Sequence, residues 1–248
     1  MSVLISIIIP THNNESTITR CLNSIAAQSF TDFEVVVALD HCTDKTKETV
    51  LKHRLSSQIN VVENTEEASA ANARNAALAA AKGRFIAFLD ADDAMAPDRL
   101  KTQLDFMTAN NLAFTYSQYN VHKANGDVFL FKPPKVATYK KILKTTYIGC
   151  STVMIDRRAH PNLRMATDAP KREDAATWLS ILKTGEKAFC INRPLVEYFM
   201  ETGSVSSSKR KMIKYQWNLL RRNQNINWFA SVYYMITWAW HGFWKYRL

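Results

Sequence analysis

Short apolar runs alternate with amphipathic stretches over the first hundred residues of this chain. The runs are rich in β-branched or aromatic side chains and have the length of strands, and they cover residues 5–9, 33–39, 59–62 and 85–89. Because strands that alternate with helices pair side by side through right-handed crossovers, the pattern predicts a mostly parallel sheet.

The stretches between these strands predict helices. Ile18, Cys21, Leu22 and Ile25 share one face of the first helix. A second helix is expected to start at Thr43 or Asp44 and to run to about residue 55. An alanine-rich third covers 68–81 with Gly83 in the C-cap position, and a fourth has Pro97 in its first turn.

The second half of the chain has a different pattern. An Asn125-Gly126-Asp127 turn between two apolar runs indicates a hairpin, and a helix is expected over 173–183. Strands are predicted at 112–121, 128–131, 150–155, 187–191 and 195–199. We interpret residues 1–203 as one α/β domain with a Rossmann-like mixed sheet and helices on both faces, made of halves 1–95 and 96–203, and residues 204–248 as a C-terminal helical appendage.

Polar residues follow three of the predicted parallel strands. They are Thr11-His12-Asn13, Asp40 and Asp90-Ala91-Asp92-Asp93. Open α/β sheets bind ligands at the carboxyl ends of their strands, so these clusters are expected to share one crevice. Three carboxylates within four residues repel one another, which favours a divalent cation such as Mn²⁺ or Mg²⁺ as compensation, with a solvated acidic turn as the alternative. The chain has neither a GxGxxG nor a GxxxxGK[ST] phosphate loop.

Charge is unevenly distributed along the chain. The net charge is +10, no acidic residue follows Glu201, and eight lysines and arginines do. An apolar content of 47% excludes a disordered chain, and four scattered cysteines indicate reduced thiols in a cytoplasmic protein. Residues 3–9 lack the basic flank and cleavage site of a targeting segment, so we interpret them as the first strand.

The basic tail contains an uncharged, aromatic stretch over residues 226–244. It is nearly long enough to cross a bilayer, but Asn227, Ser231, Thr237 and His241 lie among its Trp and Tyr residues. We therefore predict that this stretch is a helix on the surface of the cytoplasmic membrane. The next alternative is packing on its own domain or on a dimer partner, and the least favoured is a transmembrane span. Nucleic acid is a further candidate for a basic aromatic tail but is not expected, because the aromatic stretch lacks interleaved cations.

Several motifs, in order and spacing, resemble the family 2 glycosyltransferases of the GT-A fold. They are Ser6-Ile7-Ile8-Ile9-Pro10-Thr11-His12-Asn13, Val37-Ala38-Leu39-Asp40-His41-Cys42-Thr43-Asp44, Ala73-Arg74-Asn75, Phe88-Leu89-Asp90-Ala91-Asp92-Asp93 and Lys171-Arg172-Glu173-Asp174. The segments Tyr147-Ile148-Gly149-Cys150-Ser151 to Gly203-Ser204-Val205-Ser206-Ser207 are similar to the members that build teichuronic acid, capsule and O-antigen chains.

The resemblance implies an inverting, metal-dependent hexosyl- or N-acetylhexosaminyltransferase. It would move a sugar from a nucleotide donor, with UDP expected, to a hydroxyl of a lipid-linked or growing polysaccharide acceptor at the inner face of the cell membrane. In that case residues 1–95 form the nucleotide-sugar-binding half and 96–203 the acceptor half. Two alternatives from other classes are a non-catalytic nucleotide-sugar-binding protein and a membrane- or nucleic-acid-binding module that acts through the tail.

The resemblance also implies roles for residues on the donor side. Asp40 would accept a hydrogen bond from the uracil edge, with Pro10, Thr11, His12 and Asn13 around the nucleotide; its alternative role is a helix N-cap. Arg74 would reach the diphosphate or ribose, or else make a structural salt bridge. Asp92 would bind the metal ion, and Asp90 the ribose hydroxyls or the metal's shell.

On the acceptor side, the resemblance makes Asp174 the catalytic base, with Glu173 as the fallback. A helix N-terminus is expected to lower the pKa of Asp174. Asp93 would face the acceptor or close the turn, and Trp178 would be a sugar platform or a core residue. The chain departs from the family at Leu39, where a second acidic residue is usual, and at Phe199, where many relatives are basic. Lys209 or Arg210 are candidates to replace that basic residue.

Overall fold

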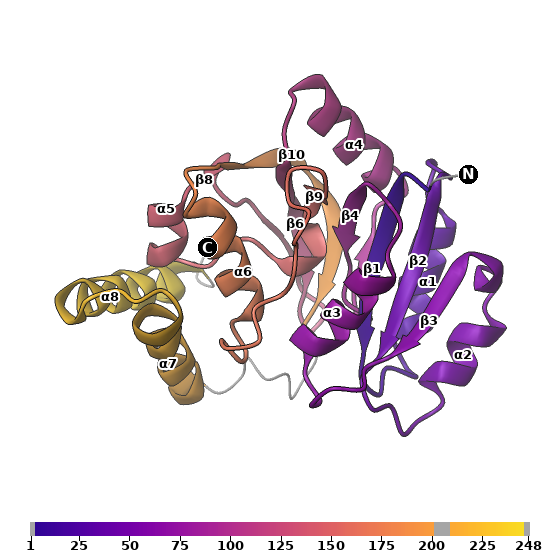
Figure 1. The fold of residues 1–248 in the computed structure, drawn as a ribbon, viewed down its shortest axis with the longest axis horizontal. Helices are drawn as coiled ribbons and strands as arrows, with labels where there is room; N and C mark the ends of the chain where they lie inside the picture. The colour runs from indigo at the N-terminus through magenta and orange to yellow at the C-terminus, as the bar shows by residue number, and fades with distance from the viewer. Residues whose placement is uncertain (1–2, 201–208, 246–248) are drawn as a thin grey trace.

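A computed structural model describes residues 3–200 and 209–245 of the chain (Figure 1). Four parallel strands form one half of a mixed sheet, in the spatial order β3(Ile59–Glu63), β2(Phe33–Leu39), β1(Ile5–Thr11) and β4(Phe85–Phe88). β1 and β2 are buried almost throughout, which explains their continuous apolar sequence, since a central parallel strand contacts a core layer on both faces.

The other half of the sheet is mixed. β9(Met154–Asp156) runs antiparallel between β4 and β6(Phe114–His122), and β10(Ala188–Phe199) pairs parallel with β6. β5(Ala94–Met95) and β8(Val136–Ala137) pair with β10, and β7(Val128–Phe131) forms the predicted hairpin with β6. The mixed sheet expected from the sequence is therefore confirmed.

Helices cover both faces of the sheet, as predicted. Neighbouring residues of β1 contact different core layers: Ile7 and Ile9 belong to one, and Ile8 to the other. The layer around Ile7 is completed by α1(Ile18–Ala26), α2(Thr46–Lys52) and α4(Arg99–Ala109). The layer around Ile8 is completed by α3(Ala70–Ala80), α5(Tyr139–Lys144) and α6(Glu173–Leu182).

The C-terminal segment consists of α7(Lys209–Asn218), a π-helical turn η4(Leu219–Asn223) and α8(Trp228–Lys245). Leu219 and Leu220 of η4 are buried in the same core layer as α5 and α6, and α8 lies against α5. Figure 1 shows α7 and α8 at the end of the molecule opposite α2. No helix within 3–200 or 209–245 combines the length and apolar character needed to cross a bilayer.

Gly83 was predicted as the C-cap of α3, and this is wrong. The helix ends at Ala80 with Ala81 as its C-cap. A Cβ atom on Gly83 would lie 2.5 Å from the backbone nitrogen of Ser6, so glycine is needed here because the chain passes directly against β1.

Three other boundaries differ from the sequence prediction. α2 begins at Thr46 rather than at Thr43 or Asp44, and α4 begins at Arg99, two residues beyond Pro97. Residues 150–152 form the 3-10 turn η2(Cys150–Thr152) instead of the start of a strand. The two strands predicted at 187–199 form the single strand β10, whose pairing register shifts on both sides of Pro194.

Candidate active site

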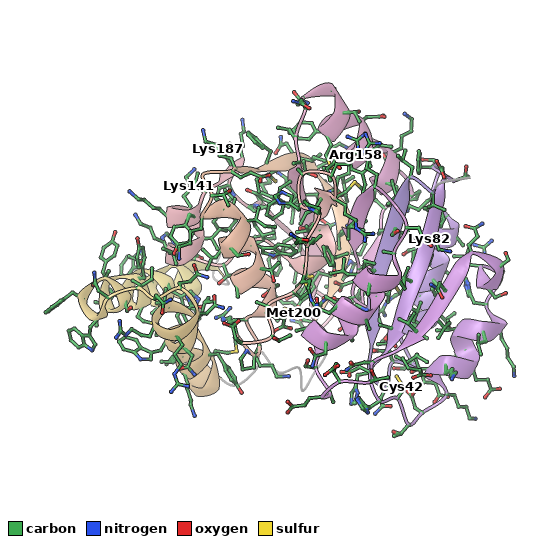
Figure 2. The ribbon with its side chains drawn as sticks, in the orientation of Figure 1. Cys42, Lys82, Lys141, Arg158, Lys187 and Met200 are labelled. Carbon is green, nitrogen blue, oxygen red and sulfur yellow. The ribbon has the colours of Figure 1, made fainter. Side chains whose placement is uncertain are left out.

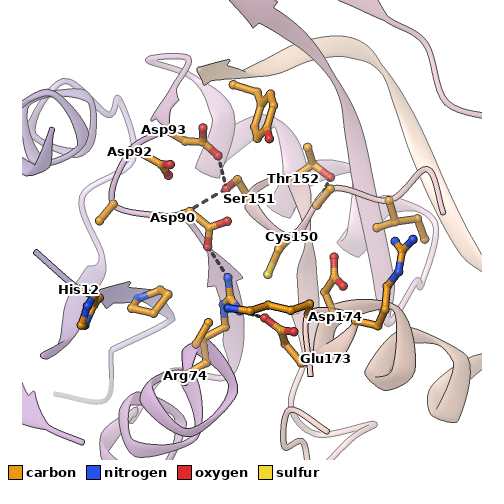
Figure 3. Close-up of a pocket in the computed structure, with 18 of the residues that line it drawn as sticks. His12, Arg74, Asp90, Asp92, Asp93, Cys150, Ser151, Thr152, Glu173 and Asp174 are labelled. Atoms are coloured by element: carbon orange, nitrogen blue, oxygen red, sulfur yellow. Dashed lines mark hydrogen bonds and ion pairs between the residues drawn. The ribbon is translucent and has the colours of Figure 1, made fainter. Parts of the chain in front are cut away.

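A cavity of about 750 Å³ opens at the carboxyl ends of β1, β2 and β4, where the sequence predicted a crevice. Its wall includes residues that follow those strands, together with Arg74 from α3 and two carboxylates at the start of α6 (Figure 3). The predicted site residues that line it are Pro10, Thr11, His12, Asp40, Arg74, Asp90, Asp92, Asp93, Glu173 and Asp174.

At the β1–β2 end of the cavity, Asp40 is buried and held by Asn64, whose Nδ2 donates to Oδ1 at 2.7 Å. The Asp40 carbonyl lies 2.6 Å from Nδ1 of His12, an arrangement in which the ring nitrogen donates. Asp40 is not a helix N-cap, because α2 begins only at Thr46. The backbone N–H of Thr46 donates to the side chain of Asp44, not to that of Asp40. The N-cap alternative for Asp40 is therefore wrong.

Asn13 does not line the cavity. Its Oδ1 accepts hydrogen bonds from the backbone N–H groups of Thr43 and Asp44, at 2.8 and 3.4 Å, and its φ of 54° places it in the left-handed region that asparagine tolerates. Asn13 ties the loop after β1 to the loop after β2. Its predicted place beside the nucleotide is corrected to support of the two loops that carry His12 and Asp40.

Arg74 joins the two acidic parts of the site. Its Nη2 lies 2.5 Å from Oδ1 of Asp90, and its Nη1 lies 3.5 Å from Oε1 of Glu173. Burial opposes the charged form of Arg74, but attraction to Asp90 and Glu173 outweighs it and raises the pKa of the guanidinium well above its usual value. Arg74 therefore makes the salt bridge that was its alternative role. This salt bridge fixes α3, the acidic turn Asp90–Asp93 and α6 relative to one another.

Asp93 closes the acidic turn. Its Oδ2 accepts from Oγ of Ser151 at 2.5 Å, and its Oδ1 accepts from the backbone N–H of Phe199 at 3.2 Å. The same Ser151 hydroxyl accepts from the backbone N–H of Asp90, so one side chain clamps both ends of the turn. Burial, followed by the charges of Asp90 and Asp92, raises the pKa of Asp93 well above its usual value. Of the two roles predicted for Asp93, the structure has the one that closes the turn.

Arg20, on α1, reaches the acidic turn from outside the cavity. Its Nη2 donates to the backbone carbonyl of Asp92 at 2.5 Å, and its guanidinium carbon lies 3.7 Å from the centroid of the Phe199 ring. On the same ring, His122 stacks at 4.5 Å between centroids. Phe199, at the position where the family resemblance led us to expect a basic residue, therefore supports a cation from another element. The side chains of Lys209 and Arg210, the sequence candidates for this role, lie outside the described residues.

Two arginines thus contact the turn that carries Asp90, Asp92 and Asp93. Charge crowding by itself does not require a metal ion, because these guanidinium groups already offset part of the repulsion. The sequence assigned no role to Arg20 or to Ser151, although Ser151 lies in a segment that is similar to the family, because both contacts join segments far apart in the chain.

Asp174 and Glu173 form the first turn of α6 and face the cavity together. Burial, and then the charge of Glu173, raises the pKa of Asp174 to about 6, against the opposing effect of a 2.6 Å hydrogen bond from its own helix at the N–H of Ala175. The expectation that the helix N-terminus lowers this pKa is wrong, because desolvation and the neighbouring carboxylate exceed the effect of the helix dipole.

Trp178 does not lie on the acceptor side of the cavity. It is fully buried, and its ring packs against Phe88 at 5.6 Å and Phe114 at 5.3 Å between centroids. The first turn of α6 meets the cavity, whereas the next turn lies over the sheet. The prediction of a sugar platform at Trp178 is wrong, and its alternative, a core residue, is correct.

The donor atoms suited to a metal ion are the carboxylate oxygens of Asp90 and Asp92. Among the described residues, no three His, Cys, Asp or Glu side chains gather as a complete metal site. Mg²⁺ and similar ions at phosphate-binding sites commonly use one or two carboxylates and take further ligands from the substrate phosphates and water. The two aspartates at the cavity wall fit this kind of incomplete, substrate-assisted site.

The amino-acid sequence that forms most of this site matches a known family. The sequence model described as Glycosyl transferase family 2 matches residues 6–162, which is more than half of the chain and extends from the second residue of β1 to beyond β9. The chain belongs to glycosyl transferase family 2. The resemblance inferred from the sequence motifs is confirmed, and the protein is a glycosyltransferase.

Two curated relatives match this glycosyltransferase over nearly their full length. The putative teichuronic acid biosynthesis glycosyltransferase TuaG of Bacillus subtilis (strain 168) is 36% identical over 95% of this chain and 94% of its own. The UDP-Glc:alpha-D-GlcNAc-diphosphoundecaprenol beta-1,3-glucosyltransferase WfgD of Escherichia coli is 37% identical over 94% of this chain and 91% of its own.

Solved structures show that the fold is GT-A. TarS of S. aureus, in complex with UDP-GlcNAc, superposes with a TM-score of 0.69 at 21% identity and covers 88% of this chain and 67% of its own. The mannosyltransferase PcManGT of Pyrobaculum calidifontis, in complex with GDP-Man and Mn²⁺, superposes with a TM-score of 0.70 at 19% identity and covers 90% of this chain and 64% of its own.

Proposed function

We propose that this glycosyltransferase is an inverting, metal-dependent enzyme that transfers a hexose or N-acetylhexosamine from a UDP-sugar to a hydroxyl of a lipid-linked or growing surface polysaccharide. The observation that carries the proposal is the convergence of three acidic groups from separate elements on one cavity: Asp40, the Asp90–Asp92 pair, and Glu173 with Asp174. The cavity has the size of pockets that hold ligands such as a nucleotide sugar.

The donor is proposed to lie along the ends of β1, β2 and β4. Asp40 is buried and held by Asn64, so its carboxylate is oriented to accept a hydrogen bond from the uracil imide N–H. Pro10, Thr11 and His12 form the adjoining wall. A UDP donor is supported by the name of WfgD and by the UDP-GlcNAc complex of TarS.

Asp92, with Asp90 beside it, is proposed to hold Mn²⁺ or Mg²⁺. Such an ion, when bound, would neutralise charge on the departing diphosphate. Arg74 keeps Asp90 in place, and the hydrogen bond from Arg20 fixes the backbone of Asp92. The Mn²⁺ complex of PcManGT, which shares the fold, supports this choice of cofactor.

Asp174 is proposed to be the catalytic base. In a single displacement, the acceptor oxygen forms a bond to the anomeric carbon while the bond from that carbon to the diphosphate oxygen breaks, and the acceptor's proton passes to the carboxylate. A pKa of about 6 leaves Asp174 mostly ionised at pH 7 and still basic enough to take the proton. Glu173 is less suited, because Arg74 lies 3.5 Å from its Oε1.

The proposed acceptor and location follow from the relatives and from the tail. The name of WfgD describes a diphosphoundecaprenol-linked acceptor, which resides in a membrane. We propose that this enzyme works at the cytoplasmic face of the cell membrane, with residues 1–203 as the catalytic domain and 204–248 as the segment that contacts lipid. A role as a non-catalytic nucleotide-sugar-binding protein is the second candidate, and nucleic acid is not a proposed partner.

The test is a screen of UDP- and GDP-sugars for release of the nucleoside diphosphate, with Mn²⁺, with Mg²⁺ and with EDTA. The proposal predicts release from one or more UDP-sugars that requires metal and is abolished by Asp174→Asn. Thermal stabilisation by a UDP-sugar without any turnover by the wild type would instead favour the non-catalytic candidate. Indifference of both binding and turnover to metal would refute the assignment of Asp92.

A further inference from the structure

α8 presents a row of large apolar side chains to solvent. Phe229, Tyr233, Ile236 and Trp240 are spaced by four, three and four residues, so they fall on one face of the helix. Their exposed fractions are 81%, 51%, 65% and 64%. Single exposed apolar residues are ordinary, but a contiguous row of four on one helix marks a surface that contacts something else. We call these four residues the α8 stripe.

The orientation of the stripe is fixed by the opposite face of the helix. Ser231 is fully buried, and Tyr234 and Met235 pack against the core layer that contains α5 and η4. α8 is therefore attached to the body through one face, and the stripe is what remains outside. To cover the stripe with the protein's own domain, α8 would have to rotate and lose the contacts of Ser231, Tyr234 and Met235 with the core layer.

The surroundings of the stripe carry positive charge. Lys144 of α5 has its Nζ 5.8 Å from the centroid of the Tyr233 ring, and Lys140 and Lys141 of the same helix are exposed. Figure 2 shows Lys141 at the outer surface of the molecule. Lys214 of α7 and Arg222 of η4 are exposed as well.

Acidic residues are absent from the same segments of the sequence. None occurs between Asp127 and Asp156, the stretch that contains α5, and none follows Glu201. The segments α5, α7, η4 and α8 therefore bring lysines and arginines, and no carboxylate of their own, to this end of the molecule. Asp168, which accepts a hydrogen bond from Asn223 of η4 at 2.7 Å, is an acidic residue from another segment that contacts them.

We propose that the α8 stripe docks on an anionic lipid surface, with α8 lying in the plane of the membrane and its rings at the headgroup boundary. Trp and Tyr favour that boundary, and lysines and arginines near it are attracted to anionic headgroups. A second copy of this chain is a poorer fit, because it would bring a like-charged rim against this one. The link to a lipid-borne acceptor rests on the proposed function, whereas the docking itself does not.

The test is co-flotation of the full-length protein with vesicles of neutral phosphatidylcholine, alone or mixed with phosphatidylglycerol. We expect binding to the mixed vesicles that weakens as salt rises. Phe229→Ser and Trp240→Ser should each weaken it about tenfold, because each removes a ring that docking would bury in the lipid. The double variant Lys140→Gln/Lys141→Gln should weaken binding to the mixed vesicles about fivefold for each charge removed, and it should leave any binding to neutral vesicles unchanged. Leu51→Ser is the matched control, because Leu51 is a 55%-exposed apolar residue on α2, at the other end of the molecule.

Several outcomes would overturn the inference. They are the absence of vesicle binding by the wild type, equal loss with Leu51→Ser, a stripe-dependent dimer in light scattering, and stripe-dependent binding to RNA in place of vesicles. Nucleoside diphosphate release by the wild type in the absence of vesicles distinguishes the two proposals. An active enzyme that ignores vesicles refutes the docking and the proposed lipid contact of residues 204–248, but not the proposed transfer reaction. An inactive protein that binds vesicles refutes the transfer reaction, but not the docking.

Discussion

Arg74 Nη2 lies 2.5 Å from Asp90 Oδ1 while Nη1 of the same guanidinium lies 3.5 Å from Glu173 Oε1. One buried cation on α3 thus connects the turn after β4 with the first turn of α6. These are the two places from which the proposed metal ligand and the proposed base arise. The distance between the turn after β4 and the proposed catalytic carboxylate therefore depends on Arg74.

Replacing Arg74 by Met keeps the apolar stem and removes the charge. We expect the free energy of unfolding to fall by about 2 kcal/mol, because Asp90 and Glu173 lose the cation that neutralises them. The loss is smaller than for a fully buried ion pair, because both carboxylates are partly exposed in the cavity. Urea unfolding measures it. Arg193→Met removes an ion pair of similar length to Asp98 in which both side chains are exposed, and it should cost less than about 1 kcal/mol. Equal effects of the two changes would contradict the account.

Asp174→Asn should abolish activity and stabilise the protein. Loss of the base is expected to lower kcat by roughly 10²–10⁴-fold. The pKa of Asp174 is raised to about 6 in the folded state, above the value of an unfolded aspartate, so its ionisation destabilises the fold as pH rises through 6. Asparagine keeps an oxygen to accept from Ala175, and at pH 7 it should add on the order of 1–2 kcal/mol. Thermal unfolding at pH 7 and pH 4 measures this, and the gain should disappear at the lower pH.

The activity of the wild type should have an acidic limb set by the same carboxyl group. Below a pH of about 6, kcat/KM for the acceptor should fall about tenfold per pH unit, because the protonated carboxyl cannot accept the acceptor's proton. Initial rates at saturating donor between pH 4.5 and 8 measure it. A limb centred near pH 4 would mean that Asp174 is not desolvated in the working enzyme, or that another group is the base.

Arg20 and Phe199 should act as one unit. Arg20→Gln removes both the stacking on Phe199 and the charged hydrogen bond to the Asp92 carbonyl, so we expect about a tenfold loss in kcat/KM for the donor. Phe199→Leu should have a similar effect, and the double variant should lose little more than either single one. Arg193→Gln, which breaks an exposed ion pair with Asp98, is the control. Additive losses from the two changes would show that the ring does not position Arg20.

The donor side of the site was predictable because it depends on local rules. Parallel strands end at one edge of a sheet, so Thr11, Asp40 and Asp90 had to meet there once the strands were recognised. The start of α6 was different, since nothing in the local pattern brings Asp174 to the same edge, and only the family motif pointed to it. Its raised pKa depends on burial, which a sequence does not specify at the first turn of a helix.

The supporting contacts were beyond the sequence for a related reason. Arg20 reaches Asp92 across 72 positions in the chain, and Ser151 reaches Asp93 across 58. Long-range side-chain contacts of this kind leave no periodic pattern. Trp178 illustrates the opposite error. Its place one turn after the proposed base suggests a functional role, but its neighbours Phe88 and Phe114 make it a core residue.

The measurement that tests the central claim most directly is the calorimetric affinity of UDP for the wild type and for Asp92→Asn, with Mn²⁺ and with EDTA. If a carboxylate-held cation carries the diphosphate, Mn²⁺ should tighten UDP binding to the wild type at least about tenfold. The gain should vanish in Asp92→Asn and persist in the exposed control Asp105→Asn. Equal affinity of the wild type with Mn²⁺ and with EDTA, or a full metal effect in Asp92→Asn, would contradict it.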